Sequence, residues 1–374
     1  MTNLLLIWCI LAVFEVAIFS SYTLITYIYS KKLNVAPDID YLPKITFVIP
    51  MFNERKVIKE KIINTANLEY PEDKINVIIL DDHSTDDSKD ISLETIEEIG
   101  LDANLIESKG GKGKAKALNW LFQSLENEIT VISDADALLK EDSLLQITKN
   151  FVDPDIGAAT GKIVILSDKK RISKSQEDSY RYFFDIWRLG ESNIQSVSIC
   201  NGPLMSFRTD LLKKIEIDPE TYADDSDMFF KIIRRGYRAI YDPEAIVFER
   251  VPLSIKGRLV QKMKRINGLR RVYLKNLDLL GRGPFGKIVY PYALLINIVS
   301  PVFLLFLIIL YPLVALQNPL FYGILLFLLV PRVGGTLVSF LITQLMMNFS
   351  FLVPTSGSWK AIEDARYKID TSDR

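Results

Sequence analysis

Long apolar runs flank a central region of more mixed pattern in this chain. Residues 4–29 are almost continuously apolar and are followed by Lys31 and Lys32, and two further runs cover residues 288–316 and 320–353. A helix of about 20 apolar residues can cross a bilayer. The pattern therefore predicts one membrane crossing before the central region and two after it.

The first run has the length of an anchor. A cleaved signal peptide would have a basic start, a shorter apolar core and a small-residue cleavage site, and this run has none of them. We therefore expect a retained anchor with Lys31 onward in the cytoplasm, because positive residues mark that side. Residues 320–353 would extend about 50 Å as a helix, so we expect one tilted or kinked crossing with an interfacial end. Three crossings would leave residues 359–368 cytoplasmic, in agreement with their Lys and Arg content.

Two charged residues, Glu15 and Arg332, interrupt these runs. Counted from the outer end they lie at similar depths, and charges inside a membrane are costly unless paired. One interpretation is that the two side chains form an ion pair. The other is that Glu15 is protonated while Arg332 extends to the interface.

The central region alternates between apolar strands and amphipathic helices. Continuous apolar strands alternating with helices are typical of a parallel sheet covered on both faces, so we expect an α/β fold. In such a sheet the ligand site lies at the carboxyl ends of the strands. The expected strands cover residues 44–53, 75–87 and 129–137, and the expected helices cover residues 54–68, 88–99 and 112–125.

Polar side chains follow each of these strands. Because the carboxyl ends of parallel strands meet at one edge of a sheet, we expect these side chains to converge on one crevice. They are Asn53, Glu54, Asp81, Asp82, Asp134 and Asp136.

Composition limits the chemistry of that crevice. The chain is 49% hydrophobic and 24% charged over 374 residues, which fits a protein that is partly soluble and partly in a membrane. A net charge of −1 gives no basic field for nucleic acid. With only Cys9, Cys200 and His83 as soft ligands, a disulfide framework or zinc site is not expected. Any metal must be held by oxygen.

The pair Asp134 and Asp136 follows a buried strand and is surrounded by alanines. Mg²⁺ and Mn²⁺ take oxygen ligands and often bridge one or two carboxylates to substrate phosphates. We therefore expect a cation site, with the alanines leaving room for a diphosphate. The alternative is a solvated turn, in which aspartate is common.

A glycine-rich basic segment, residues 110–119, leads into a helix and suits a phosphate. A flexible basic loop is the alternative, since neither the P-loop nor the dinucleotide-binding spacing is present. Asp81 or Asp82 could accept a hydrogen bond from a base or a ribose, or could belong to a turn before an acidic helix cap. The acids at residues 224–227 could supply a general base, or could only favour the helix dipole.

Residues 255–275 carry eight Lys or Arg and no acid, just before the second apolar run. Such a helix is typical of an interface with anionic lipid. One of its residues could also reach a phosphate.

Taken in order, these motifs resemble a membrane-anchored glycosyltransferase of family 2 with the GT-A fold, a mostly parallel Rossmann-like sheet. The resemblance covers about residues 44–275, and the helix layout is similar to ceramide glucosyltransferase and the processive polysaccharide synthases. The matching segments are FVIPMFNE, DDHSTDDS, GKAKALN, SDADA, CNGPLMSFR, ADDSD with RRGYR, and QKMKR.

The resemblance implies a role for each matching position. Asp225 is implied as the general base, with Asp224 beside it. Asn201, Gly202 and Pro203 belong to the implied acceptor-side loop. The implied nucleotide-sugar site comprises Pro50, Phe52, Asn53, Glu54, Asp81, Asp82, Lys114, Asp134, Gln261, Lys264 and Arg265, and the implied ligands of Mn²⁺ or Mg²⁺ are Asp134 and Asp136.

The chain departs from the family pattern at two places. Ala223 and Asp224 replace a Thr-Glu pair, which is a mild change. In the family's Q-x-x-R-W motif, Gln261 is followed here by Lys264 and Arg265, so the tryptophan is missing. In the processive synthases that tryptophan lies near the acceptor sugar. Its absence favours single transfer to a lipid or lipid-linked acceptor over a processive polysaccharide synthase.

We therefore expect an inverting, metal-dependent transferase that uses a nucleotide sugar, by family habit a UDP-sugar. Its sugar, acceptor and oligomeric state stay open. A nucleotidyltransferase would carry a glycine- and arginine-rich loop where PMFNE stands, and a non-catalytic accessory subunit is the other alternative. The expected domains are an anchor at residues 1–30, a catalytic domain at 44–250, a basic helix region at 251–286, membrane helices at 287–353 and a cytoplasmic tail at 354–374. The expected location is the plasma membrane.

Overall fold

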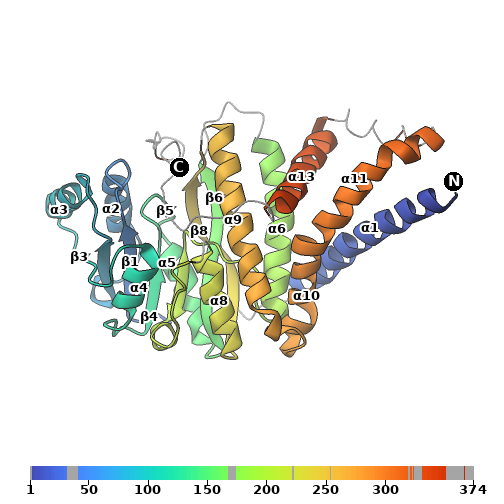
Figure 1. Cartoon of the computed structure of the whole chain (residues 1–374). Helices are drawn as coiled ribbons and strands as arrows, with labels where there is room; N and C mark the ends of the chain where they lie inside the picture. Colours follow the sequence, from blue (N-terminus) through green and yellow to red (C-terminus); the bar gives the residue numbers. More distant parts are fainter. Residues whose placement is uncertain are drawn as a thin grey trace.

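The computed structural model describes residues 2–31, 41–166, 174–220, 223–252, 254–318, 321, 323, 331–350 and 366. A sheet with helices on both faces forms one end of the molecule, and long helices form the other (Figure 1). Between the two ends lie α6 and α9, which connect the sheet to the long helices (Figure 1).

The sheet has eight strands in the order β3-β2-β1-β4-β7-β6-β8-β5. The first four run parallel to one another, as the alternating pattern predicts, whereas β7 is antiparallel to both β4 and β6. The sheet is therefore mixed. The strands are β1 Ile45–Met51, β2 Ile75–Asp81, β3 Ala103–Glu107, β4 Ile129–Ile132, β5 Leu138–Leu139, β6 Ile156–Leu166, β7 Met205–Arg208 and β8 Arg238–Arg250.

Strand β1 shows why the central strands carry apolar residues on both faces. All of its residues are buried. Val48 belongs to the apolar cluster on one side of the sheet, while Phe47 and Ile49 belong to the cluster on the other. Since successive side chains point to opposite faces, a strand covered on both faces needs apolar residues on both.

Helices α3 and α9 have the bounds that the sequence predicts, whereas α2 begins four residues later, because residues 54–57 belong to the turn after β1. The helices of this end of the molecule are α2 Ile58–Ala66, α3 Ser88–Ile99, α4 Lys114–Phe122, α5 Ser143–Lys149, α6 Lys174–Ile194, α7 Thr209–Leu212, α8 Asp224–Arg234 and α9 Ile255–Lys275.

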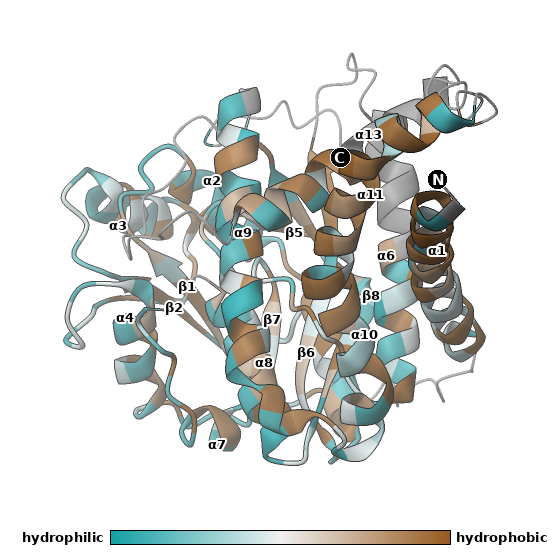
Figure 2. Cartoon of the chain, turned by 45° about the vertical axis from the view of Figure 1, so that its right-hand side comes forward, coloured by the Kyte–Doolittle hydropathy of each residue, from teal (hydrophilic) through white to brown (hydrophobic). Residues whose placement is uncertain are grey.

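Among the described residues, two helices are long and apolar enough to cross a membrane, Asn3–Ser30 within α1 (Thr2–Ser30) and Phe285–Gln317. Figure 2 shows the apolar colouring of α1 and α11. The second helix comprises η4 Phe285–Val289, α10 Tyr290–Leu294, η5 Leu295–Val299 and α11 Ser300–Gln317, and a further helix, α13, covers Pro331–Phe349.

The first long helix is joined to the sheet end through α6. A side chain at Gly190 would place its Cβ 2.2 Å from the carbonyl oxygen of Thr26, so only glycine allows the two backbones to approach this closely. Nearby, Trp187 donates a hydrogen bond of 3.0 Å to Thr23, and Tyr22 donates one to the buried carboxylate of Glu191. The α1–α6 contact therefore combines close packing with buried polar contacts.

One of the two charges inside the apolar runs has a partner in the described chain. Ser300 donates a hydrogen bond of 2.6 Å to Glu15. The Arg332 side chain lies outside the described residues, as does nearly all of the segment 359–368. The Glu15–Arg332 pair and the orientation of that tail therefore stay predictions.

Candidate active site

The turns that follow β1, β2 and β4 meet at one edge of the sheet. These strands are adjacent and parallel, in the order β2-β1-β4. The Asp82 N–H donates to the Met51 carbonyl at 2.8 Å, and the Ser133 N–H donates to the Val48 carbonyl at 3.0 Å. The predicted polar residues are therefore brought to one edge, as the strand pattern predicts.

The turn after β1 is held by the turn after β2. Asn53 has a φ of 54°, in the left-handed region that asparagine tolerates better than most residues. Its side-chain oxygen accepts a hydrogen bond of 2.8 Å from the Thr85 N–H, and the Glu54 N–H donates at 2.7 Å to Ser88. This reversal turns the Glu54 carboxylate into the site, where it is only 2% exposed.

The neighbouring aspartates after β2 have different partners. Asp81 is fully buried, accepts a hydrogen bond from the Ser84 N–H and lies 3.2 Å from the Lys89 ammonium. Asp82 accepts two hydrogen bonds, at 2.8 and 3.0 Å, from the Gly113 N–H. Asp81 thus stabilises the turn, and Asp82 holds the glycine-rich segment against the site.

Lys114 begins α4 and connects two acidic groups. Its ammonium lies 2.7 Å from Asp134 and 3.6 Å from Asp224. Burial alone would lower the pKa of Lys114, but the carboxylates of Asp134 and Asp224 outweigh burial and raise it. The lysine therefore keeps its positive charge beside the acidic loop that follows β4.

That acidic loop is held by Lys61, which none of the sequence motifs indicates. Lys61 is fully buried and donates hydrogen bonds of 2.7 Å to the Ser133 hydroxyl and to the Ala137 carbonyl. Ser133 in turn donates at 2.8 Å to the carbonyl of Pro203, in the predicted acceptor-side loop. Burial lowers the pKa of Lys61 to about 7. The only sequence signal is a lysine on the apolar face of α2.

The alanines around the two aspartates do not serve the purpose predicted for them. Ala135 is 4% exposed and Ala137 is fully buried, and both pack in the apolar cluster under the loop. They are small because the loop lies directly on the core. The expectation that they leave room for a diphosphate is therefore wrong.

Asp134 and Asp136 fit a divalent cation by their chemistry. Burial and the neighbouring Asp134 charge raise the pKa of Asp136, and a cation bound here would relieve the repulsion between the two carboxylates. No cluster of three or more acidic, histidine or cysteine side chains suited to a metal occurs in the described part of the chain. A cation here would thus take two carboxylates and complete its shell from water or a ligand.

Asp225 lies at the start of α8, beside Asp224. Burial and the Asp224 charge raise the pKa of Asp225 to about 6. One carboxylate oxygen accepts a hydrogen bond of 2.6 Å from the Ser226 N–H, and the other faces Gly202, where an added Cβ would lie 3.0 Å away. A carboxylate with a raised pKa against a bare backbone segment has the properties of a general base.

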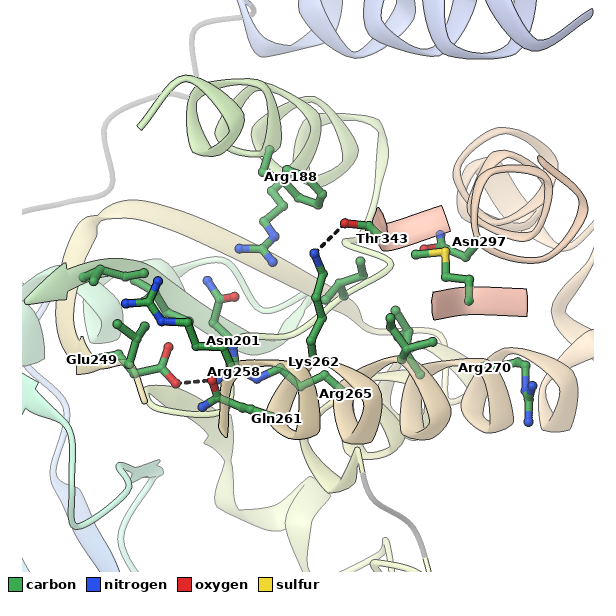
Figure 3. Close-up of a pocket in the computed structure, with 18 of the residues that line it drawn as sticks. Arg188, Asn201, Glu249, Arg258, Gln261, Lys262, Arg265, Arg270, Asn297 and Thr343 are labelled. Atoms are coloured by element: carbon green, nitrogen blue, oxygen red, sulfur yellow. Dashed lines mark hydrogen bonds and ion pairs between the residues drawn. The ribbon is translucent and has the colours of Figure 1, made fainter. Parts of the chain in front are cut away.

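A cavity of about 460 Å³ opens next to Asn201, between the sheet and the long helices. Figure 3 shows charged side chains converging on it from several elements. Lys262 in α9 contacts Thr343 of α13, and Arg265 pairs with Glu249. The cations that line it are Arg188, Arg258, Lys262, Arg265 and Arg270, and the acids are Asp185 and Glu249.

Of the three motif residues predicted on α9, Gln261 and Arg265 line this cavity. Lys264 is not among the cavity-lining residues. Asn201 lines it too, and its side chain donates a hydrogen bond of 2.6 Å to the Gly161 carbonyl. The cavity thus adjoins the loop that carries Gly202, on the side of the molecule where the long helices lie.

A second unforeseen residue, Arg366, reaches the edge of the sheet from the far end of the chain. Its guanidinium pairs with both carboxylate oxygens of Glu54 and lies 3.9 Å from Asp136. Burial raises the pKa of Glu54 to about 7 even though Arg366 opposes it. A separation of 312 residues leaves no local sequence signal for this contact.

Comparison with known proteins shows what this part of the chain is similar to. Residues 46–215 match the model of glycosyl transferase family 2. Over these residues the chain is similar to family 2 glycosyltransferases. The sheet edge described above is where the family resemblance of the motifs implies a nucleotide sugar, and the fold is the GT-A fold expected from those motifs.

Two groups of relatives share this glycosyltransferase domain. The poly-β-1,6-N-acetyl-D-glucosamine synthase of Staphylococcus aureus is 26% identical over 249 residues, and its Staphylococcus epidermidis counterpart is 24% identical over 250. These matches cover 66% of this chain and 60% of the synthases. A mannosyltransferase from Pyrobaculum calidifontis, solved with GDP-Man and Mn²⁺, has 28% identity and a TM-score of 0.79. That match covers 93% of this chain and 98% of the mannosyltransferase, so it extends well beyond the catalytic domain.

Proposed function

We propose that this protein is an inverting, metal-dependent glycosyltransferase that moves a sugar from a nucleotide sugar to a membrane-associated acceptor. The observation that carries the proposal is the position of Lys114, which lies 2.7 Å from Asp134 and 3.6 Å from Asp224, next to Asp225. One lysine thus joins the predicted donor-binding loop to the residue beside the predicted base. The reaction needs these two groups side by side.

On the donor side, Asp82 recognises the base, and Lys114 binds the diphosphate. Asp134 and Asp136 would hold Mn²⁺ or Mg²⁺, which when bound offsets the negative charge that builds on the leaving diphosphate. Lys114 contributes to the same stabilisation because it stays protonated among carboxylates. Lys61 positions the loop through its hydrogen bonds to Ser133 and Ala137.

On the acceptor side, Asp225 takes the proton from the attacking hydroxyl. The raised pKa of this carboxylate, about 6, allows it to be ionised at neutral pH and still to accept a proton in the transition state. Attack opposite the leaving group forms the new glycosidic bond as the bond to the diphosphate breaks. The anomeric configuration is therefore inverted.

For the donor we propose GDP-mannose. The relative that matches this chain along 98% of its own length is a mannosyltransferase solved with GDP-Man and Mn²⁺. The family habit of UDP-sugars and the match to the polyglucosamine synthases support a UDP-sugar as the second candidate, but that match covers only 60% of the synthases. The polyglucosamine synthases also make processive synthesis the alternative to single transfer. Arg265 stands where the family motif has tryptophan, and this counts against processive synthesis.

For the acceptor we propose a lipid with an anionic head group. The cavity beside Asn201 has more cations than acids, which suits a phosphate. It also contains Met347 of α13 and so adjoins the long apolar helices. With α1 and Phe285–Gln317 crossing the plasma membrane, the catalytic domain would receive its acceptor from the cytoplasmic leaflet.

The test is transfer by the purified full-length protein in detergent with Mn²⁺ and a polyprenyl phosphate. We expect label from GDP-mannose in the lipid fraction and no transfer after EDTA treatment. In Asp225→Asn we expect kcat to fall at least about a hundredfold, because the base is lost. Asp210→Asn, an exposed aspartate paired with Lys214, is the matched control and should keep full activity.

Other outcomes separate the alternatives. Label from UDP-N-acetylglucosamine in a long polymer would support the processive synthase and contradict single transfer. If the folded protein releases no diphosphate from any nucleotide sugar, the result would support the alternative of a non-catalytic accessory subunit. Full activity of Asp225→Asn would remove this residue from the proposed mechanism.

A further inference from the structure

Arg366 is a buried cation at the donor edge that comes from outside the matched catalytic region. Its side chain is 7% exposed, and that of Glu54 is 2% exposed. The Nε and one terminal nitrogen of the guanidinium each donate to a different oxygen of Glu54. This two-point contact fixes both the position and the plane of the guanidinium.

The remaining surroundings of Arg366 are also acidic. Asp136 lies 3.9 Å away. Lys114 contacts Asp134, the other carboxylate of the pair. Of the two carboxylates that would hold the cation, Asp134 is paired with Lys114 from α4, and Asp136 lies close to Arg366.

Stabilisation of the fold does not by itself explain why Arg366 and Glu54 are buried together. Removing two charges from water costs several kcal/mol per ion, so a buried ion pair seldom stabilises a fold more than apolar packing would. Burial indeed raises the pKa of Glu54 to about 7 despite the arginine beside it. A charged group buried at such cost in a ligand crevice is better explained by what it binds.

The chemistry of that ligand follows from the guanidinium. Its planar set of five donors matches the oxygens of a phosphate as well as those of a carboxylate. Two of its nitrogens already donate to Glu54. Glu54 therefore holds the guanidinium in position without using all of its donors. The diphosphate of a nucleotide sugar held at Asp134 and Asp136 would lie beside it.

We infer that Arg366 is a donor-binding residue that contacts the diphosphate of the nucleotide sugar and is held in position by Glu54. The inference rests on the proposed function. It means that the donor site is completed by a residue about 150 positions beyond the end of the family match at residue 215.

The experiment measures binding rather than turnover. Dissociation constants for GDP, GMP, UDP and UMP are determined by titration calorimetry in Mn²⁺, for the full-length wild type, Arg366→Ala, Arg366→Lys and Arg282→Ala. Arg282 is an exposed arginine beside Asp278 and serves as the matched control. Binding of Mn²⁺ without nucleotide is measured in parallel.

We expect Arg366→Ala to weaken binding of the preferred diphosphate roughly tenfold or more, the usual value of a charged hydrogen bond. Binding of the matching monophosphate should change much less, because the lost contact is to the diphosphate. Arg366→Lys should recover part of the affinity through its charge, and Arg282→Ala should equal the wild type. A residue that only braces the turn would weaken both nucleotides equally.

Two results would overturn the inference. Equal diphosphate binding by wild type and Arg366→Ala would show that the arginine does not contact the donor. Tighter Mn²⁺ binding by Arg366→Ala, without loss of diphosphate affinity, would show that Arg366 only substitutes for the cation. If the folded wild type binds neither GDP nor UDP, the proposed function itself fails, and this outcome is distinct from both.

Discussion

At the scale of single residues, the candidate site depends on side chains that would never touch a ligand. Lys61 donates to Ser133, and Ser133 donates to the Pro203 carbonyl. The acidic loop after β4 and the loop beside Asp225 are therefore linked by one short chain of buried hydrogen bonds. Because Gly202 has no side chain, its backbone can lie directly against the Asp225 carboxylate.

Gly202→Ala tests that close approach. The added Cβ would lie 3.0 Å from an oxygen of Asp225, so the carboxylate must shift by a few tenths of an ångström. Because small displacements of a reacting group are costly, we expect kcat to fall roughly tenfold with nucleotide affinity unchanged. Gly323→Ala, where nothing lies within 4 Å of the added atom, is the control. Unchanged kcat in Gly202→Ala would contradict the assignment of Asp225 as the base.

The pH dependence of transfer is the second prediction at this scale. Only ionised Asp225 can accept a proton, and burial together with Asp224 raises the pKa of Asp225 to about 6. We therefore expect kcat/KM to rise with pH, reach half its maximum near pH 6 and level off above it. In Asp224→Asn the neighbouring charge is gone, so the midpoint should move to lower pH. A midpoint that does not move would show that another group controls the rate.

At the scale of elements, α6 connects the sheet to the long helix α1. It packs against α1 on one side and against β8 on the other. Its contacts to α1 include the bare backbone at Gly190 and the buried Glu191 carboxylate, which also accepts hydrogen bonds from Ser198 in the sheet end. The orientation of α1 is thus set by the catalytic domain itself.

Gly190→Ala tests this connection. Its Cβ would lie 2.2 Å from the Thr26 carbonyl oxygen, so α1 and α6 must separate. Overpacking of this kind costs about 1–3 kcal/mol of unfolding free energy, and we expect a lower melting temperature in detergent. Nucleotide affinity should be retained, since the donor edge lies on other elements. An unchanged melting temperature, compared with Gly323→Ala, would mean that the two helices are not held in this packing.

At the scale of the whole molecule, the family match accounts for only part of the site. It covers residues 46–215, whereas Asp225, the basic helix α9 and Arg366 all lie beyond it. The cavity between the sheet and the long helices is built from α6, β6, β8, α9 and α13 together. A catalytic domain isolated from its helices would therefore lack both the far wall of that cavity and the arginine at Glu54.

Much of this organisation follows from the sequence alone. Apolar runs of bilayer length predict the long helices, because length and hydropathy are local properties. Strand and helix periodicity predicts β1, α3 and α9. The polar residues that follow parallel strands, among them Glu54 and Asp134, are predicted to meet at one edge of the sheet. These inferences succeed because each depends on neighbours in the chain or on a general rule of sheet geometry.

The tertiary structure alone decides the remaining features. The antiparallel β7, the burial of Ala135 and the contacts of Lys61 depend on which segments pack together, and local pattern does not encode that. The pairing of Glu54 with Arg366 joins positions 312 residues apart. The sequence determines which chemical groups are available at the ends of the strands, and long-range packing determines which charges meet there.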